Sequence, residues 1–209
     1  MKLKSLSIAC FGLMAITAVA YAADAKKPDA AAMPLPPGWT AEEMQRCIAA
    51  ATPGKPHERL KQDVGTWTGK GTFWMAPGLP PVTSELTSVY TPVLDGRYVK
   101  CEMSGDMPGM GPFVGEALFG FDNVSQKYVA SMIDNHSTGI MQGEGDLTQD
   151  GKTINWEYVV NCPREQKPVN IRQVETNTSA TEKTLEMFGT DPKSGKEFKM
   201  MSIEFTKKS

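Results

Sequence analysis

From Gly65 to the end of the chain, apolar and polar side chains alternate with a period of two in short runs. Successive side chains of a strand point to opposite faces, so this alternation predicts strands that each bury one face. The clearest runs are Val99, Cys101 and Met103, then Trp156, Tyr158 and Val160, then Met201, Ile203 and Phe205. We therefore expect an all-β region over residues 65–208.

Pairs of turn-forming residues separate these runs and mark the connections between strands. They stand at Pro77-Gly78, Asp95-Gly96, Asp122-Asn123, Asp150-Gly151, and from Asp191-Pro192 to Gly195. This spacing leaves room for about eight to ten antiparallel strands, which form either a barrel or a sandwich.

A helical segment is predicted over residues 40–64. Thr40 followed by Glu43 is typical of a capping box at the start of a helix. Apolar residues then recur at helical spacing until a Pro-Gly pair ends the pattern. They are Met44, Cys47, Ile48 and Ala51, followed by Pro53-Gly54. A second short helix is expected from His57 to Val64, with Pro56 at its start.

The N-terminus is typical of a secretory signal peptide over residues 1–22. Lys2 and Lys4 precede an apolar stretch from Leu6 to Ala20, and Ala20-Tyr21-Ala22 supplies the small-x-small cleavage pattern. The stretch covers about 15 residues, fewer than the roughly 20 that a membrane-spanning helix needs. We expect cleavage after Ala22, a periplasmic or secreted mature protein, and no integral membrane segment in it.

Residues 23–39 are rich in alanine, lysine and proline and too poor in apolar side chains to pack, so we expect a flexible leader there. The chain has 22 basic and 24 acidic residues, and loss of Lys2 and Lys4 leaves 20 basic ones. A mature protein with a net charge of about −4 offers no basic field to phosphates. Nucleic acid is therefore excluded as a main partner.

The mature chain keeps three cysteines, Cys47, Cys101 and Cys162. In an oxidising compartment this odd number allows at most one internal disulfide. Cys101 and Cys162 both lie in strand-like segments and are the preferred pair. The alternative is three buried thiols.

Six blocks of sequence, read in order, carry a resemblance to a known family. They are Ala51-Thr52-Pro53-Gly54-Lys55-Pro56-His57 with Leu60, Gly65-Thr66-Trp67, Leu94-Asp95-Gly96-Arg97-Tyr98-Val99, Gly120-Phe121-Asp122-Asn123 with Lys127-Tyr128-Val129, Ile133-Asp134 with Ser137-Thr138-Gly139, and Lys196-Glu197-Phe198-Lys199 leading to Ile203. From Thr40 to Lys208 the chain resembles the bacterial family of domain of unknown function DUF1579. The resemblance implies an all-β, antiparallel, lipocalin-like barrel of the calycin type, with about eight to ten strands after a short N-terminal helix. Two positions depart from the family pattern: Met132 stands where Trp is usual, and His136 follows Asn135.

Asp134 and His136 are two residues apart on a predicted strand, so both side chains are expected on one face with Tyr128, Ala130 and Met132. That placement is what an acid–base pair or two metal ligands would require. The alternative places His136 in water at a strand end and Asp134 as a turn cap.

Other catalytic and metal-binding patterns are missing from the sequence. It lacks the hydrolase elbow, the HExxH pair, the Walker loop and the dinucleotide fingerprint. His57 and His136 are its two histidines, so one subunit has too few for a three-histidine metal site. We expect neither a cofactor nor a metal.

Four soft sulfur donors lie within ten residues, at Cys101, Met103, Met107 and Met110. Cu(I) prefers such donors, so a copper-binding loop is one interpretation. The favoured interpretation is a flexible, glycine-containing loop whose methionines pack against apolar ligands at the mouth of a barrel.

Six residues are candidate ligand contacts within a barrel. They are Trp67, Arg97, Met103, Tyr128, Met132 and Trp156. Arg97 matches a family position and could hold a ligand carboxylate, or it could pair with a surface acid. The aromatic residues could line a cavity or fill the barrel core.

The sequence favours a secreted or periplasmic lipocalin-like protein that binds a small, mainly apolar molecule. A second hypothesis is an enzyme that uses Asp134 and His136, with Arg97 as an anion contact. A third is an envelope interaction protein whose barrel is filled with side chains. The sequence leaves the oligomeric state open.

Overall fold

The computed structural model describes residues 35–208. The expected signal peptide and most of the expected leader therefore lie outside the described residues. The chain divides into two compact units between Met44 and Gln45, and each is described by itself.

The helix α1 runs from Ala41 to Ala51, as the sequence predicted. At its start Thr40 and Glu43 form the expected capping box: the Glu43 amide donates to Thr40 Oγ1 at 3.2 Å, and the Thr40 amide donates to Glu43 Oε2 at 2.8 Å. Within the second unit, the Asn123 side-chain amide donates to the carbonyls of Ala50 and Thr52, at 3.0 and 2.8 Å. These bonds satisfy carbonyls that the end of a helix leaves without a partner.

The helix α2 runs from Lys55 to Lys61, two residues earlier and three residues shorter at its end than the predicted segment. Its start is fixed at Gly54, whose amide donates to Nδ1 of His57 at 3.0 Å. Leu60 carries the helix into the hydrophobic core. The sequence placed the start too late because it offered no conventional side-chain cap at Gly54.

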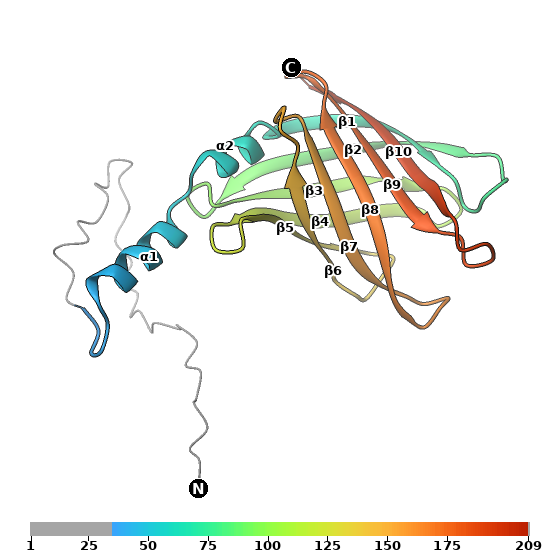
Figure 1. Cartoon of the computed structure of the whole chain (residues 1–209). Coiled ribbons are helices and arrows are strands. Elements are labelled where there is room, and N and C mark those ends of the chain that lie inside the picture. Colours follow the sequence, from blue (N-terminus) through green and yellow to red (C-terminus); the bar gives the residue numbers. More distant parts are fainter. Residues whose placement is uncertain (1–34, 209) are drawn as a thin grey trace, which may run out of the picture. The chain divides into compact units, whose positions relative to one another are not determined.

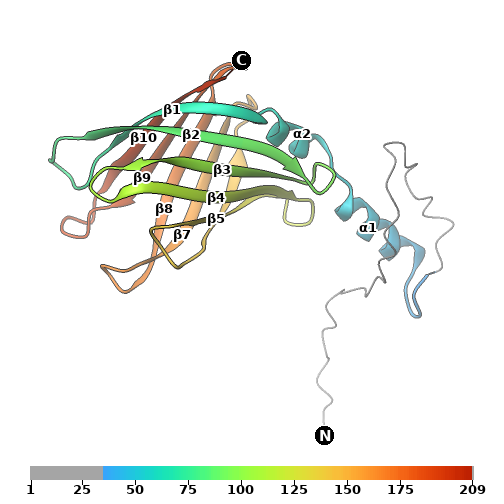
Figure 2. The same cartoon turned by 180° about the vertical axis from the view of Figure 1, so that it is seen from behind.

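Within the described residues, ten antiparallel strands close into a barrel (Figure 1). The strands are β1 (Gly65–Phe73), β2 (Val82–Val93), β3 (Tyr98–Met107), β4 (Gly111–Asp122), β5 (Lys127–Asp134), β6 (Met141–Leu147), β7 (Thr153–Cys162), β8 (Lys167–Asn177), β9 (Glu182–Thr190) and β10 (Glu197–Lys207). Each strand pairs with its neighbours in the sequence, and β1 pairs with β10 to close the ring. Closure decides for a barrel over a sandwich. Figure 1 views it from β8–β10, and Figure 2 from β1–β4.

The inward face of the barrel carries the period-two positions that the sequence identified. Val99, Cys101, Trp156, Tyr158 and Phe205 are all buried in one core cluster. The five predicted turn signals all lie at the connections between strands, with Asp122 as the last residue of β4. The alternation in the sequence therefore arises because each strand turns one face to the barrel interior and the other to solvent.

Two glycines on β6 make room for aromatic rings of β7. Gly143 pairs with Tyr158, and Gly145 pairs with Trp156. A Cβ atom at Gly143 would lie 2.4 Å from the Tyr158 ring, and one at Gly145 would lie 2.7 Å from the Trp156 ring. The rings therefore occupy the space that side chains would fill on a neighbouring strand.

The two ends of the barrel differ. At one end α2 contacts β3 and β4, and Trp67 Nε1 donates to the carbonyl of Asp63 at 2.7 Å. The other end carries the β1–β2, β3–β4, β5–β6, β7–β8 and β9–β10 connections. We call the first the closed end and the second the mouth.

Cys101 and Cys162 are unpaired in the described structure, so the expected disulfide between them is wrong. The alternative of three buried thiols is also wrong, because Cys101 is buried, Cys162 is half-buried and Cys47 is exposed. In residues 35–208, neither helix has the length and apolar character to cross a membrane.

Candidate functional site

A cavity of about 910 Å³ occupies the barrel interior on the side of the mouth. Its wall is mainly apolar and contains six methionines of the described chain. They are Met103, Met107, Met132, Met141, Met187 and Met201. Because methionine is flexible and polarisable, such a wall can adapt to apolar molecules of different shape.

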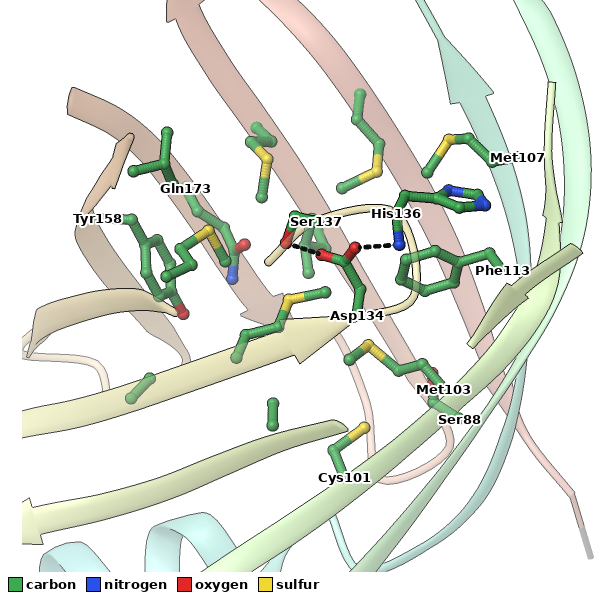
Figure 3. Close-up of a pocket in the computed structure, with 18 of the residues that line it drawn as sticks. Ser88, Cys101, Met103, Met107, Phe113, Asp134, His136, Ser137, Tyr158 and Gln173 are labelled. Atoms are coloured by element: carbon green, nitrogen blue, oxygen red, sulfur yellow. Dashed lines mark hydrogen bonds between the residues drawn. The ribbon is translucent and has the colours of Figure 1, made fainter. Parts of the chain in front are cut away.

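Asp134, the last residue of β5, and His136, in the β5–β6 connection, line the cavity at the mouth. The Asp134 carboxylate accepts from the backbone amide of His136 at 2.7 Å and from Ser137 Oγ at 3.3 Å. Figure 3 shows the His136 imidazole extending away from this carboxylate, toward Phe113 and Met107. The ring centroids of His136 and Phe113 are 5.9 Å apart.

This geometry bears on the predicted acid–base pair. Asp134 and His136 face the same cavity, but the carboxylate holds the backbone of the turn instead of the imidazole. That is the turn-capping arrangement typical of aspartate at a strand end. The imidazole Nδ1 is buried and has no hydrogen-bond partner among the described residues.

The cavity ends, toward α2, in a set of polar side chains that we call the polar floor. It consists of Ser88, Tyr90, Cys101, Gln173 and Glu175, all buried. Tyr90 and Glu175 also line a gap of about 10 Å³ beside Leu60 and Asp63, which places this floor against the closed end.

A buried group of charges lies beneath the polar floor. Lys183, only 1% exposed, donates to Glu175 Oε1 at 3.0 Å and lies 3.6 Å from Asp63 Oδ1. Asp63 in turn lies 3.3 Å from Nη1 of Arg59. The Lys183 ammonium is 4.0 Å from the centroid of the Tyr90 ring. Two acids and two bases thus compensate one another in the interior.

Burial governs the protonation of the floor. Desolvation raises the pKa of the Cys101 thiol to about 11, although the neighbouring Tyr90 hydroxyl and Lys183 oppose the shift. Desolvation also raises the pKa of Tyr90 in the floor, and of Tyr158 elsewhere in the cavity lining, above the usual tyrosine range. These three side chains are therefore uncharged at neutral pH.

The structure separates the six candidate ligand contacts. Met103 and Met132 line the large cavity. Trp67, Tyr128 and Trp156 are buried in the core cluster and do not line it. Trp67 closes the barrel end, and Trp156 borders the small gap instead.

Arg97 lies in the β2–β3 turn at the closed end, away from the cavity. Its Nη1 donates to the Leu94 carbonyl at 3.4 Å and lies 3.5 Å from the exposed Asp95 carboxylate. This is the surface pairing that the sequence left open as the alternative to a ligand contact.

Three of the four sulfur donors line the cavity and the fourth does not. Cys101 lies at the polar floor, Met103 and Met107 lie in the wall, and Met110 is exposed in the β3–β4 turn. No group of three or more histidine, cysteine, aspartate or glutamate residues that could hold a metal occurs within residues 35–208.

Sequence analysis missed Ser88, Gln173 and Glu175. The sequence did contain a signal for them, because each alternates with buried residues of its strand. Ser88 is two residues from Tyr90, and Gln173 and Glu175 follow Ile171 at two-residue steps. A polar residue in the buried phase of an amphipathic strand marks a polar group inside the barrel. The interior is also not filled with side chains, so the filled-barrel hypothesis is wrong in this respect.

Solved structures share this fold. Rv2717c from M. tuberculosis matches with a TM-score of 0.54 at 12% identity, covering 74% of this chain and 99% of its own. The S-type phycobiliprotein lyase from Guillardia theta matches with a TM-score of 0.51 at 7% identity, covering 75% of this chain and 94% of its own. At such identities the likeness concerns the fold alone.

Sequence comparison gives the family. No curated protein matches the chain. The family model described as "Protein of unknown function (DUF1579)" matches residues 52–207, which span α2 and all ten described strands. The chain therefore belongs to the DUF1579 family, as its motifs indicated.

Proposed function

We propose that the protein is an exported carrier that binds a small, mainly apolar molecule inside the barrel. The observation that carries this proposal is the cavity of about 910 Å³, which lies within the range of roughly 300–1,000 Å³ common for small-molecule sites. Its lining combines an adaptable apolar wall with a few polar groups at one end. Such a combination provides affinity from the wall and orientation from the polar groups.

The export part of this proposal rests on residues 1–22. A basic start, an apolar stretch and a small-x-small site are the three parts that secretion machinery reads.

Binding is tested by fluorescence titration with N-phenyl-1-naphthylamine, an uncharged apolar probe whose emission rises in apolar surroundings. We expect saturable binding by the wild-type protein. Ala117→Trp should weaken it at least about tenfold, because Ala117 lines the cavity and the new ring would occupy it.

Glu116→Trp is the matched control. Glu116 is the neighbouring residue on β4, but it is exposed on the outer face. The same ring placed there should leave binding within about twofold. The absence of saturable binding, or equal losses in both variants despite retained thermal stability, would contradict the carrier function.

Export is tested by expressing the full chain in a bacterium with a periplasm and measuring the intact mass of the periplasmic protein. The expected product starts at Ala23, and Ala22→Trp should block processing because the site requires a small residue. An unprocessed wild-type chain in the cytoplasm would contradict export without affecting the binding proposal.

A further inference from the structure

The polar floor contains hydrogen-bonding groups that the protein does not fully use. Ser88 is 1% exposed, lines the cavity, and its hydroxyl has no hydrogen-bond partner among the described residues. The Cys101 thiol interacts with the hydroxyls of Ser88 and Tyr90, but a thiol is a weak hydrogen-bonding group and does not replace a hydroxyl or amide partner for Ser88. A buried hydroxyl without a partner costs free energy that a bound polar group would recover.

Gln173 adds a second group to the same floor. It is 4% exposed and lines the cavity, and its register partners are Trp156 on β7 and Met187 on β9. Its amide has no hydrogen bond to another residue drawn in Figure 3, where the dashed lines join Asp134 to the His136 backbone and to the Ser137 hydroxyl. An amide both donates and accepts, as does the Ser88 hydroxyl.

The charges beside the floor do not favour an ionic ligand. Glu175 is paired with Lys183, and the four charges of Arg59, Asp63, Glu175 and Lys183 sum to zero. A ligand carboxylate would meet the Glu175 carboxylate, and a ligand ammonium would meet a carboxylate that Lys183 already holds. Either ion would lose its hydration without gaining a free counter-charge.

We propose that the polar floor is a subsite for an uncharged hydrogen-bonding group, so that the carrier selects long-chain alcohols or primary amides and holds them with the polar end innermost. This inference rests on the proposed carrier function. Ser88 and Gln173 bind the polar end, and the methionine wall surrounds the chain toward the mouth. The hydroxyl or amide thereby satisfies groups that an alkane would leave without partners.

The test compares four probes of equal chain length in displacement of N-phenyl-1-naphthylamine from the wild-type protein. The probes are decan-1-ol, decanamide, decanoate and decylammonium at pH 7.5. We expect the alcohol and the amide to bind at least about tenfold more tightly than either ion, because a buried charge has no free partner here.

Two variants assign the preference to the floor. Ser88→Ala and Gln173→Met should each weaken decan-1-ol by about three- to tenfold, the effect of one lost hydrogen bond, and leave N-phenyl-1-naphthylamine within about twofold. Met187→Leu is the control, since it alters the wall and keeps both polar groups. It should change the affinities for the fluorescent probe and for decan-1-ol by the same factor.

The outcomes separate the two proposals. If N-phenyl-1-naphthylamine fails to bind, the carrier function itself is contradicted. If it binds but either ion binds as tightly as decan-1-ol, the polar subsite is overturned while the carrier function stands. Unchanged alcohol binding by both Ser88→Ala and Gln173→Met overturns it as well.

Discussion

Lys183 is the least exposed charged residue within residues 35–208. Its ammonium is almost fully buried, is bonded to Glu175, lies near Asp63, and is covered by the rings of Tyr90 and Trp67. The Coulomb attraction and the aromatic faces offset the cost of removing the ammonium from water. The net result raises the pKa of Lys183: desolvation lowers it, but Glu175 and Asp63 together outweigh that effect.

We expect Lys183→Met to lower the free energy of unfolding by about 3–5 kcal/mol, because the buried Glu175 carboxylate loses its ion-pair partner and Asp63 keeps only Arg59. Lys127→Met is the control, since Lys127 pairs with Asp146 at the surface and should contribute less than about 1 kcal/mol. Urea denaturation of both variants at pH 7 measures the difference. Equal effects would show that the buried ammonium is dispensable.

The Cys101 thiol predicts how stability depends on alkaline pH. Its pKa is about 11 in the folded protein and near 9.0 when exposed, so the native state binds more protons between these values. The free energy of unfolding therefore falls as pH rises from about 9 to 11, by on the order of 2 kcal/mol from this group. Urea denaturation across this range measures the slope.

Ionisation of Tyr90 and Tyr158 also lowers the free energy of unfolding above pH 10, because burial raises the pKa of both in the folded protein. Cys101→Ala isolates the thiol and should flatten the slope between pH 9 and pH 10. Cys47→Ala, at an exposed position, should keep the wild-type slope. An unchanged slope in Cys101→Ala would contradict the raised pKa.

At the scale of elements, the packing of β6 against β7 requires glycines on β6 opposite large aromatic rings on β7. Gly143→Ala would place a methyl group 2.4 Å from the Tyr158 ring and 2.9 Å from the Glu157 carbonyl. We expect a loss of about 1–3 kcal/mol in the free energy of unfolding, the usual cost of overpacking. Gln142→Ala, at the exposed neighbouring position, should stay within about 0.5 kcal/mol by the same measurement.

The sequence predicted most elements because alternation and turn residues act locally. The strands, the five turns and α1 with its Thr40 cap follow from such signals. The bounds of α2 did not, since its start depends on a bond from the Gly54 amide to the His57 ring. The side chain of Asp134 was placed on the correct face, but its bond to the backbone of His136 depends on how the β5–β6 turn closes.

At the scale of the whole molecule, the sequence left barrel and sandwich open and the family resemblance favoured the barrel. The pairing of β1 with β10 decides this, and it joins residues as distant as Trp67 and Lys207. The cavity escaped prediction for a related reason. Its volume is what remains after inward side chains from all sides of the ring have packed, so no local pattern encodes it.

Three aromatic residues illustrate the same limit. Trp67, Tyr128 and Trp156 have the right periodicity to face inward, and they do. Whether an inward side chain meets a cavity or another side chain depends on its height along the barrel axis. That height is set by the register of ten described strands together, whereas alternation reports only the face.

The order of the strands has a consequence for the kinetics of folding. Every described pair of strands except β1–β10 joins neighbours in the sequence and can form as a hairpin. The β1–β10 pair, which we call the seam, must bring together segments more than a hundred residues apart. Loop closure on that scale is slow, so we expect the seam to form after the transition state. A methyl group at Gly69 would clash across the seam with Ile203 and Phe205.

Gly69→Ala should therefore accelerate unfolding and leave the folding rate nearly unchanged, whereas Gly143→Ala, inside the β6–β7 hairpin, should slow folding as well. Stopped-flow measurements in urea distinguish the two. Slow folding of Gly69→Ala would mean that the ring closes early. With a late seam, the β1–β10 junction is the place where the native barrel first opens, and the lifetime of the folded protein is set there.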